Sequence, residues 1–273
     1  MNRWAPPLFA LCILLSGCGV PSQAADNKQQ TSGELQLKLP KGLREISGLA
    51  LAADGALLAV ADERSHVYRI DVVAHTVNKH TKFGDPAARG DFEGIAVHNE
   101  RLYLVTSDGE IWVKRLDTPP TEYQRYNTGI GARCEVEGLA AWPTQDLLLV
   151  LCKEARDKSL KGQLVVFSWQ TARPAEPASV MLGVDLEQAG LPKLHPSGIT
   201  FTADGQRLFI VAARQRYFVE MTLDGEVVRA GSLPHPDTHP QTEGVVITTG
   251  NTLYLADEGD KKRGTVTRYE PTF

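Results

Sequence analysis

One pattern recurs five times along this chain. In each copy, Ser or Glu precedes a glycine and a short run of small apolar residues, and a polar turn and a more strongly apolar run follow. The glycines are spaced by roughly 45 residues, with one longer interval of about 60. The copies are EISGLALAADGALLAVADE (45–63), DFEGIAVHNERLYLVTSDGE (91–110), EVEGLAAWPTQDLLLVLCKE (135–154), HPSGITFTADGQRLFIVAARQ (195–215) and QTEGVVITTGNTLYLADEGD (241–260).

Each copy continues into further strands. A third strand pattern follows every copy and a fourth follows the first four, whereas the chain ends before the fifth copy gains one. Residues 33–40 form a strand pattern with no copy of their own. Repeated antiparallel four-stranded units are typical of a β-propeller, whose closed ring leaves few exposed strand edges. We therefore predict an all-β, five-bladed β-propeller closed by an N-terminal strand; the long interval leaves six blades as the alternative.

The N-terminus is typical of a bacterial lipoprotein. Residues 1–17 combine a positive charge with a short apolar run, and the sequence LSGC ends at Cys18. We expect a signal peptide that is cleaved before Cys18 and a lipid on its thiol; an ordinary secretory signal is the alternative. Gly19 is typical of sorting to the outer membrane. Residues 18–33 are predicted to be the lipidated cysteine and a flexible tether, and residues 34–273 the propeller domain. The expected location is the cell envelope, lipid-anchored in the outer membrane and facing the periplasm.

Two cysteines remain in the expected propeller. Cys134 and Cys152 lie on either side of the turn WPTQD (142–146), and residues equidistant from a hairpin turn face each other. Because the expected compartment is oxidising, we predict a disulfide, with two buried free thiols as the alternative. The absence of CxxC spacing argues against a metal site made by these cysteines.

Composition excludes some classes of function. The chain is 42% hydrophobic and 23% charged, with a formal net charge of −4, which is ordinary for a soluble domain. No basic stripe is present, so nucleic-acid binding is not expected, and we expect a monomer. The mature sequence has no GxSxG, HExxH, P-loop or GxGxxG motif. Residues 184–190 are one short candidate helix, and His235 and His239 are predicted to be solvated loop residues.

The repeats gather acidic residues at one place. In a propeller blade, the first strand begins and the second strand ends at the same mouth of the central channel. Converging carboxylates repel one another unless a cation is present, and Ca²⁺ accepts several oxygen ligands at flexible geometry. The alternatives are pairing with nearby Arg and Lys, or hydrogen bonds between blades from the residue before each glycine. The candidate metal ligands are Glu93, Glu137 and Glu243, then Asp62, Asp108 and Asp257; the other candidate mouth residues are Glu45, Ser47, Glu154, His195, Ser197 and Arg214.

The repeat motifs resemble a known family. EISGLA, DFEGIA, CEVEGLA, HPSGIT and QTEGVV are similar to the inner hairpins of the SdiA-regulated bacterial propellers, over roughly residues 38–270. That resemblance implies a five-bladed fold, distantly related to NHL-repeat propellers, and a bound calcium ion, but no established activity. Ser47 and Ser197 depart from the repeated Glu.

Two functions follow as hypotheses. The first is a calcium-binding, non-enzymatic module, anchored to the membrane through Cys18, that presents loops to a protein, peptide or other ligand at the channel mouth. The second is a metal-dependent hydrolase of the lactonase or phosphoesterase type, by resemblance to gluconolactonase propellers, with Glu93, Glu137 or His195 as the base. A mouth crowded with acids and arginines favours the first.

Overall fold

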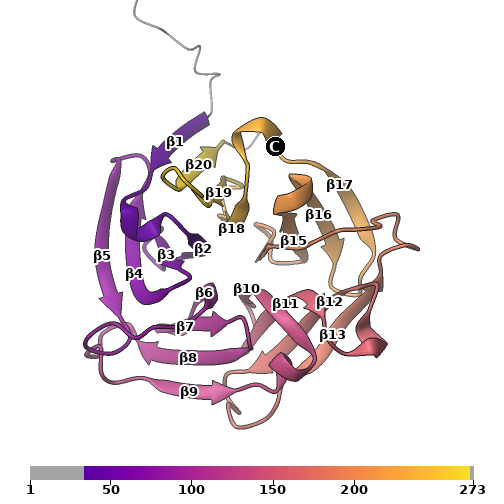
Figure 1. Ribbon diagram of the computed structural model, residues 1–273, viewed down its shortest axis with the longest axis horizontal. Helices are drawn as coiled ribbons and strands as arrows, with labels where there is room; N and C mark the ends of the chain where they lie inside the picture. The colour runs from indigo at the N-terminus through magenta and orange to yellow at the C-terminus, as the bar shows by residue number, and fades with distance from the viewer. Residues whose placement is uncertain (1–33, 271–273) are drawn as a thin grey trace, which may run out of the picture. The chain divides into compact units, whose positions relative to one another are not determined.

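Four-stranded antiparallel sheets stand around a central axis in the computed structural model, which describes residues 34–270 (Figure 1). Within this range there are five such sheets, so the five-bladed prediction is confirmed and the six-bladed alternative is wrong. The predicted signal peptide, Cys18 and the tether lie outside the described residues. No helix in the described range is long and apolar enough to cross a membrane.

The strands of each blade follow one another outward from the axis. Blade 1 comprises β2 (Ile46–Leu51), β3 (Leu57–Ala61), β4 (Arg64–Asp71) and β5 (Thr76–Lys82). Blade 2 comprises β6 (Phe92–His98), β7 (Arg101–Thr106), β8 (Glu110–Arg115) and β9 (Gln124–Asn127). Blade 3 comprises β10 (Cys134–Ala141), β11 (Leu147–Ala155), β12 (Gln163–Gln170) and β13 (Ser179–Asp185). Blade 4 comprises β14 (Gly198–Phe201), β15 (Arg207–Ala212), β16 (Tyr217–Thr222) and β17 (Val227–Ser232).

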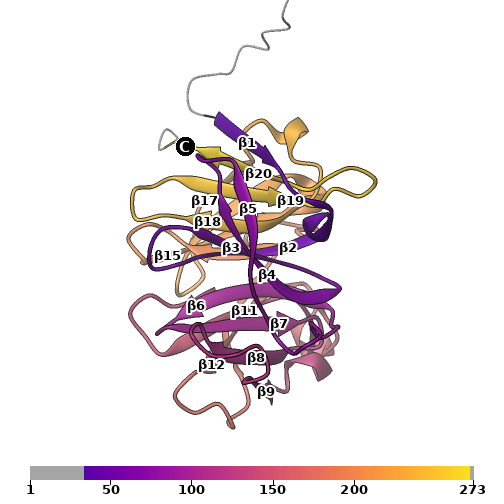
Figure 2. The same ribbon diagram turned by 90° about the vertical axis from the view of Figure 1, so that its left-hand side faces the viewer.

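The fifth blade joins the two ends of the described chain. β18 (Thr242–Ile247), β19 (Leu253–Asp257) and β20 (Thr265–Tyr269) are completed by β1 (Glu34–Lys38), which pairs antiparallel with β20 (Figures 1 and 2). The predicted closing strand is therefore confirmed. Short 3₁₀ turns occupy some of the loops: η1 (Lys41–Leu43), η2 (Ile130–Ala132), η3 (Lys158–Leu160), η4 (Ala213–Gln215) and η5 (Pro236–Thr238).

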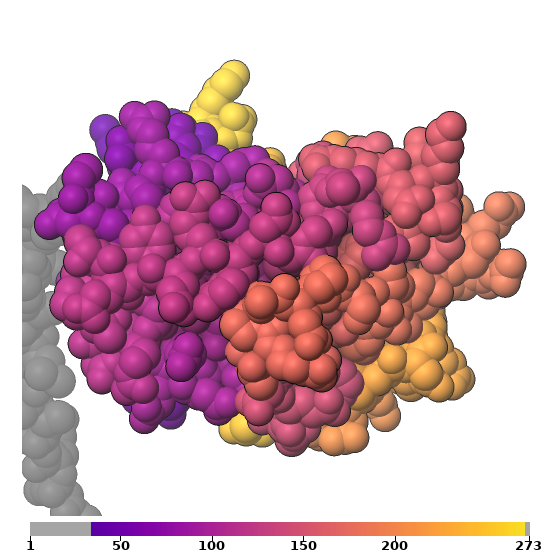
Figure 3. Space-filling view, turned by 90° about the horizontal axis from the view of Figure 1, so that it is seen from below, coloured from indigo at the N-terminus to yellow at the C-terminus, as the bar shows by residue number. Residues whose placement is uncertain are grey.

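The core lies between the blades. Five clusters of buried apolar side chains each join two neighbouring sheets. Alternate residues of one strand enter different clusters: Val150 packs towards blade 2, whereas Leu149 and Leu151 pack towards blade 4. Because an inner strand is covered on both faces, it is apolar at successive positions rather than at every second one. This explains the run LLLVLC in β11. On the side of blades 2 and 3, the rim is a continuous surface (Figure 3).

Two details differ from the sequence-based expectations. The candidate helix at 184–190 is a turn: the backbone N–H of Gln188 bonds the side chain of Asp185, and Gly190 has φ +72°. An acidic side chain that bonds the following backbone favours such a turn over a helix. The disulfide between Cys134 and Cys152 is confirmed, with Cα atoms 5.7 Å apart, but Cys152 pairs across the hairpin with Val136 because bulges shift the register.

Candidate functional site at the channel mouth

The residue before the repeat glycine is the extra residue of a β-bulge in four inner strands. In β6, Phe92 pairs with Thr106 and Gly94 pairs with Val105, so Glu93 has no partner across the hairpin. The same register shift occurs at Ser47, Glu137 and Glu243. A bulge redirects a side chain away from the regular alternation of the strand. The repeat therefore places these side chains near the start of the innermost strand of each of these four blades, beside the channel axis.

The repeat glycines allow the inner strands to touch. A Cβ atom on Gly94 would lie 2.7 Å from the backbone N of Leu139 in blade 3, and one on Gly198 would lie 2.5 Å from the backbone O of Glu243 in blade 5. No larger residue fits without movement of the neighbouring backbone. The five strands are consequently drawn tightly around the axis, and the residues before the glycines are brought together.

Ser47 and Ser197, the two serines that precede repeat glycines, connect neighbouring blades. Ser47 Oγ donates to the backbone O of Phe92 at 2.6 Å, and Ser197 Oγ donates to the backbone O of Thr242 at 2.7 Å. Each serine therefore bonds the residue just before the next blade's glutamate. At these two positions, where Ser replaces the repeated Glu, the side chain forms a hydrogen bond between blades.

Among the three glutamates that precede repeat glycines (Glu93, Glu137 and Glu243, called here the glutamate ring), Glu137 forms an ion pair with Lys153. Lys153 Nζ lies 2.8 Å from Glu137 Oε1 and 3.6 Å from Glu135 Oε1. The side chain of Glu137 is only 7% exposed, and its Oε2 atom is buried without a hydrogen-bond partner in the structure. A buried carboxylate oxygen without a partner is costly. Lys153 therefore satisfies only one oxygen of Glu137.

Burial and mutual repulsion raise the pKa values of the glutamate ring, Glu93, Glu137 and Glu243. Burial, then the charges of Glu137, Asp91 and Glu243, raises the pKa of Glu93 to about 9. Burial, with repulsion from Glu258 and Glu137, raises the pKa of Glu243 to about 8 against a lowering hydrogen bond from Gln241. Without a cation at the axis, these two carboxyl groups hold protons at neutral pH.

The space inside the ring is small. A cavity of about 10 Å³ lies on the axis, between the inner strands of all five blades. That volume is close to the minimum for one water molecule. Its position suits a single ion or water, and a larger ligand would have to sit outside the ring, at the open mouth. The lining includes Ser47, Glu93, Glu243 and the glycines 48, 94, 138 and 198.

A second tier of charge surrounds the ring. Asp62 and Glu258 follow the ends of β3 and β19, as Lys153 occupies the corresponding place in blade 3. Burial, then repulsion from Glu45, Glu63 and Asp91, raises the pKa of Asp62, although a backbone hydrogen bond from Glu63 lowers it. Burial followed by repulsion from acidic neighbours also raises the pKa of Glu258. Sequence reasoning left Lys153 and Glu258 out of the candidate ligands; the strand register identifies both.

The other candidates lie at varied positions. Glu45 is bound to Arg44 at 2.6 Å, and Asp108 is exposed and accepts from the Thr106 hydroxyl. Glu154 and Arg214 are exposed. His195 is half-buried, and its backbone N–H donates a hydrogen bond to the side-chain oxygen of Gln215. No three His, Cys, Asp or Glu side chains between residues 34 and 270 already form a group that could hold a metal ion.

Asp257 belongs to a buried network inside blade 5. Its Oδ2 atom is 2.7 Å from His239 Nδ1, and its Oδ1 atom accepts from Thr242 at 2.8 Å. The other ring nitrogen of His239 is 2.6 Å from the hydroxyl of Tyr269. His239 is fully buried, so the prediction of a solvated loop residue is wrong. This network ties the loop before β18 to β19 and β20, and no local motif announces it because its members are distant in sequence.

Comparison with known proteins gives a family match. A family model described as "Phytase-like: Esterase-like activity of phytase" matches residues 41–229, and no curated protein sequence matches. Similar solved structures include a luciferin-regenerating enzyme (13% identity, 87% of this chain and 95% of that one, TM-score 0.49). Others are a streptogramin B lyase (13%, 88% and 73%, TM-score 0.47) and a computationally designed protein, Ika8 (11%, 82% and 58%, TM-score 0.43).

Proposed function

This chain belongs to the phytase-like family, and we propose that its propeller binds Ca²⁺ at the channel mouth, where the bound ion organises a surface for a protein, peptide or other ligand. The observation that carries the proposal is the buried, unpartnered Oε2 atom of Glu137 beside two further glutamates. Without a cation, Glu93 and Glu243 hold protons at neutral pH. If all three glutamates were ionised, they and Lys153 would together carry a net charge of −2. A divalent cation matches that charge, and Ca²⁺ prefers carboxylate oxygens.

The donor types suit such an ion, and the three carboxylates would have to move together to bind it, because between residues 34 and 270 no three such side chains already form a metal-binding group. Glu93, Glu137 and Glu243 would supply carboxylate oxygens, and Lys153 would remain on Oε1 of Glu137, where it already lies. A hard cation would lower the pKa values that repulsion now raises, because it favours the charged form of each carboxyl group. Backbone carbonyls and water can complete the coordination of Ca²⁺.

Metal analysis and thermal unfolding test the proposal. We expect Ca²⁺ to co-purify with the protein, EDTA to lower Tm, and added Ca²⁺ to restore it. Glu137→Gln should abolish the response to Ca²⁺, whereas Glu154→Gln, which changes an exposed carboxylate on the neighbouring strand β11, should keep it. The proposal fails if no metal co-purifies and Tm does not respond to Ca²⁺.

A second candidate function is metal-dependent hydrolysis of an ester, lactone or phosphoester. The family description, which refers to esterase-like activity, favours it. The ion would polarise a substrate oxygen held outside the ring, because the axial cavity has no room for a substrate. Hydrolysis of p-nitrophenyl acetate, p-nitrophenyl phosphate and a simple lactone, measured with Ca²⁺ and with EDTA, separates the two functions. Turnover that is lost in EDTA and in Glu137→Gln would favour the hydrolase.

The envelope location is a further part of the proposal. The LSGC sequence supports lipidation of Cys18 and an outer-membrane anchor facing the periplasm, and a disulfide suits that oxidising compartment. The similarity of the repeat motifs to SdiA-regulated propellers fits the same setting. Membrane fractionation and labelled-lipid incorporation test the anchor: Cys18→Ala should move the protein to the soluble fraction. Equal membrane association of Cys18→Ala and the parent would contradict it.

A further inference from the structure

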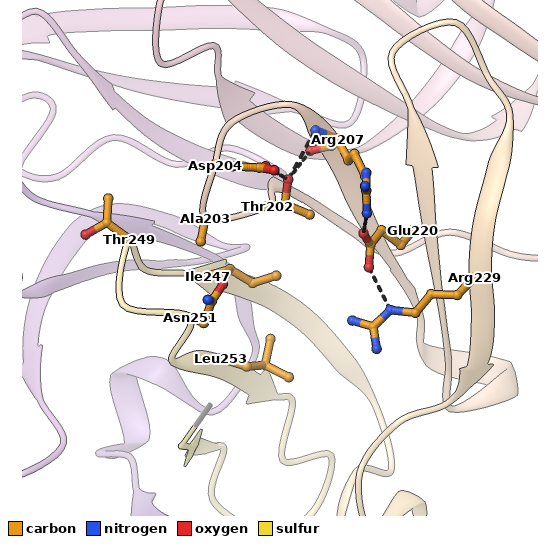
Figure 4. Close-up of a pocket in the computed structure, with 10 residues that line it drawn as sticks. All are labelled: Thr202, Ala203, Asp204, Arg207, Glu220, Arg229, Ile247, Thr249, Asn251 and Leu253. Carbon is orange, nitrogen blue, oxygen red and sulfur yellow. Dashed lines mark hydrogen bonds and ion pairs between the residues drawn. The ribbon is translucent and has the colours of Figure 1, made fainter. Parts of the chain in front are cut away.

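A second and much larger cavity lies between blades 4 and 5. It has a volume of about 490 Å³, which falls within the range of small-molecule sites. Its walls come from the β14–β15 turn, the β18–β19 turn and strands β15, β16 and β17 (Figure 4). These turns lie at the opposite end of the inner strands from the bulged glutamates, so this cavity is separate from the channel mouth. The family match ends at residue 229, and Ile247, Thr249, Asn251 and Leu253 lie beyond it.

One wall is a buried carboxylate held by two arginines. Glu220 Oε1 accepts from Arg207 Nη1 at 2.8 Å, and Glu220 Oε2 accepts from Arg229 Nε at 2.7 Å. Glu220 and Arg229 are direct cross-strand partners. Burial alone would raise the pKa of Glu220, but the hydrogen bonds from both arginines lower it. The carboxylate is therefore ionised and fixes both guanidinium groups at the cavity wall.

The ion pairs keep the charge of Glu220 inside the protein, but they do not use every donor of Arg207. The Glu220 side chain is 7% exposed, and removal of such a charge from water offsets much of what its ion pairs contribute. Arg229 also lies over the Phe218 ring, 5.2 Å from its centre. Arg207 is 44% exposed and uses one N–H on Glu220; within residues 34–270 its other side-chain N–H groups have no acceptor. These groups are available to a ligand.

The remaining walls supply complementary groups. Asp204 Oδ1 accepts from the Thr202 hydroxyl at 2.6 Å and from the Gln206 backbone N–H at 3.0 Å. These bonds lower the pKa of Asp204 and keep its charge. Figure 4 shows Asn251 and Ile247 on the side of the cavity that faces Glu220 and the arginines. Asn251 offers an amide donor and acceptor, and Ile247 and Leu253 offer an apolar surface.

The charges of this cavity cancel. Arg207 and Arg229 balance Asp204 and Glu220, so the formal net charge of the lining is zero. Donors and acceptors on the rim, with an apolar patch beside them, suit a neutral molecule that carries several hydroxyl groups and a C–H face. We propose that this cavity binds a neutral polyhydroxylated ligand of monosaccharide or cyclitol size.

Ligand-observed NMR and calorimetry on the full-length protein test this site. The probes are glucose, N-acetylglucosamine and myo-inositol, with inorganic phosphate as the anionic probe. We expect at least one neutral probe to bind. Arg207→Gln should lower the affinity for that probe by roughly 10- to 100-fold, because a charge-assisted hydrogen bond is lost. Asn251→Gly should weaken binding as well, because glycine keeps the backbone conformation at φ +60° and removes the side chain that carries the amide.

A matched variant and two outcomes make the test decisive. Asn99→Gly changes an asparagine at φ +47° in the equivalent turn of blade 2, outside the cavity, and should leave probe binding unchanged. The proposal is overturned if no neutral probe binds at tens of millimolar, or if only phosphate binds. It is also overturned if binding survives both Arg207→Gln and Asn251→Gly. EDTA should not alter probe binding, which separates this site from the proposed ion.

Discussion

At the scale of single residues, the glutamate ring links stability to pH. In the protein without a bound cation, the pKa of Glu93 is about 9 and that of Glu243 about 8, against an ordinary value of 4.5. Between the ordinary and the raised values, the folded state holds protons that the unfolded state releases. The free energy of unfolding must therefore fall as pH rises through this interval. The contribution is complete below pH 4.5 and lost as pH passes the folded-state values.

The resulting prediction concerns EDTA-treated protein. We expect its free energy of unfolding to decrease from pH 5.5 to pH 9, and added Ca²⁺ to reduce that decrease. Carboxyl groups with lowered pKa values, such as Asp204, change protonation below pH 5.5, so they do not contribute to the change in stability between pH 5.5 and pH 9. Urea unfolding at three pH values measures the effect. A metal-free protein that is equally stable at pH 5.5 and 9 would contradict the raised pKa values.

Glu93→Gln isolates one member of the ring. Glutamine imitates the protonated carboxyl group, so the variant should lose no protons on unfolding at this position. We expect it to be more stable than the parent at pH 9 in EDTA and to gain less from Ca²⁺. Glu135→Gln is the control, because Glu135 lies further out and is bound by Lys153 and Arg156. Destabilisation of Glu93→Gln at pH 9 would show that the ionised carboxylate is already compensated.

At the scale of elements, contact between inner strands depends on the repeat glycines. Gly94→Ala would bring a Cβ atom to 2.7 Å from the Leu139 backbone N, which is backbone and cannot turn aside. We expect a loss of about 1–3 kcal/mol of stability from this overpacking. Gly231→Ala is the matched control, since its Cβ would meet only the Phe218 ring at 3.5 Å. Thermal unfolding of both variants measures the difference; equal Tm values would show that the blades separate easily.

Some elements were predictable from sequence and others were not. The repeats predicted the blades and the closing strand, because apolar strands and polar turns are local patterns. The position of the two cysteines about one hairpin turn predicted the disulfide. They also predicted Glu93, Glu137 and Glu243 at one mouth. The bulges that redirect these side chains depend on register, which the sequence pattern left undefined. The cavity beside Glu220 draws its walls from two blades, and no local motif joins residues so far apart.

At the scale of the whole molecule, the circle of five blades is closed by β1, a strand of a few residues. β1 pairs with β20 along its whole length, from Glu34 opposite Tyr269 to Lys38 opposite Thr265. Leu37 and Leu39 are buried in the cluster between blades 5 and 1. The last blade therefore depends on a strand from the opposite end of the chain for both its edge and its core.

Removal of that strand should open the propeller. Deletion of residues 34–39 leaves the edge of β20 unpaired and removes two buried leucines from the core. The loss of each leucine side chain should lower the free energy of unfolding by about 2–5 kcal/mol, as truncation of a buried leucine does. We expect lower Tm, loss of cooperative unfolding and concentration-dependent association through the exposed edge. Calorimetry and light scattering measure these changes, with Lys38→Ala, an exposed position on β1, as the control. A monomer that unfolds cooperatively at the parent's Tm would mean that blade 5 is stable with three strands and that ring closure contributes little to this fold.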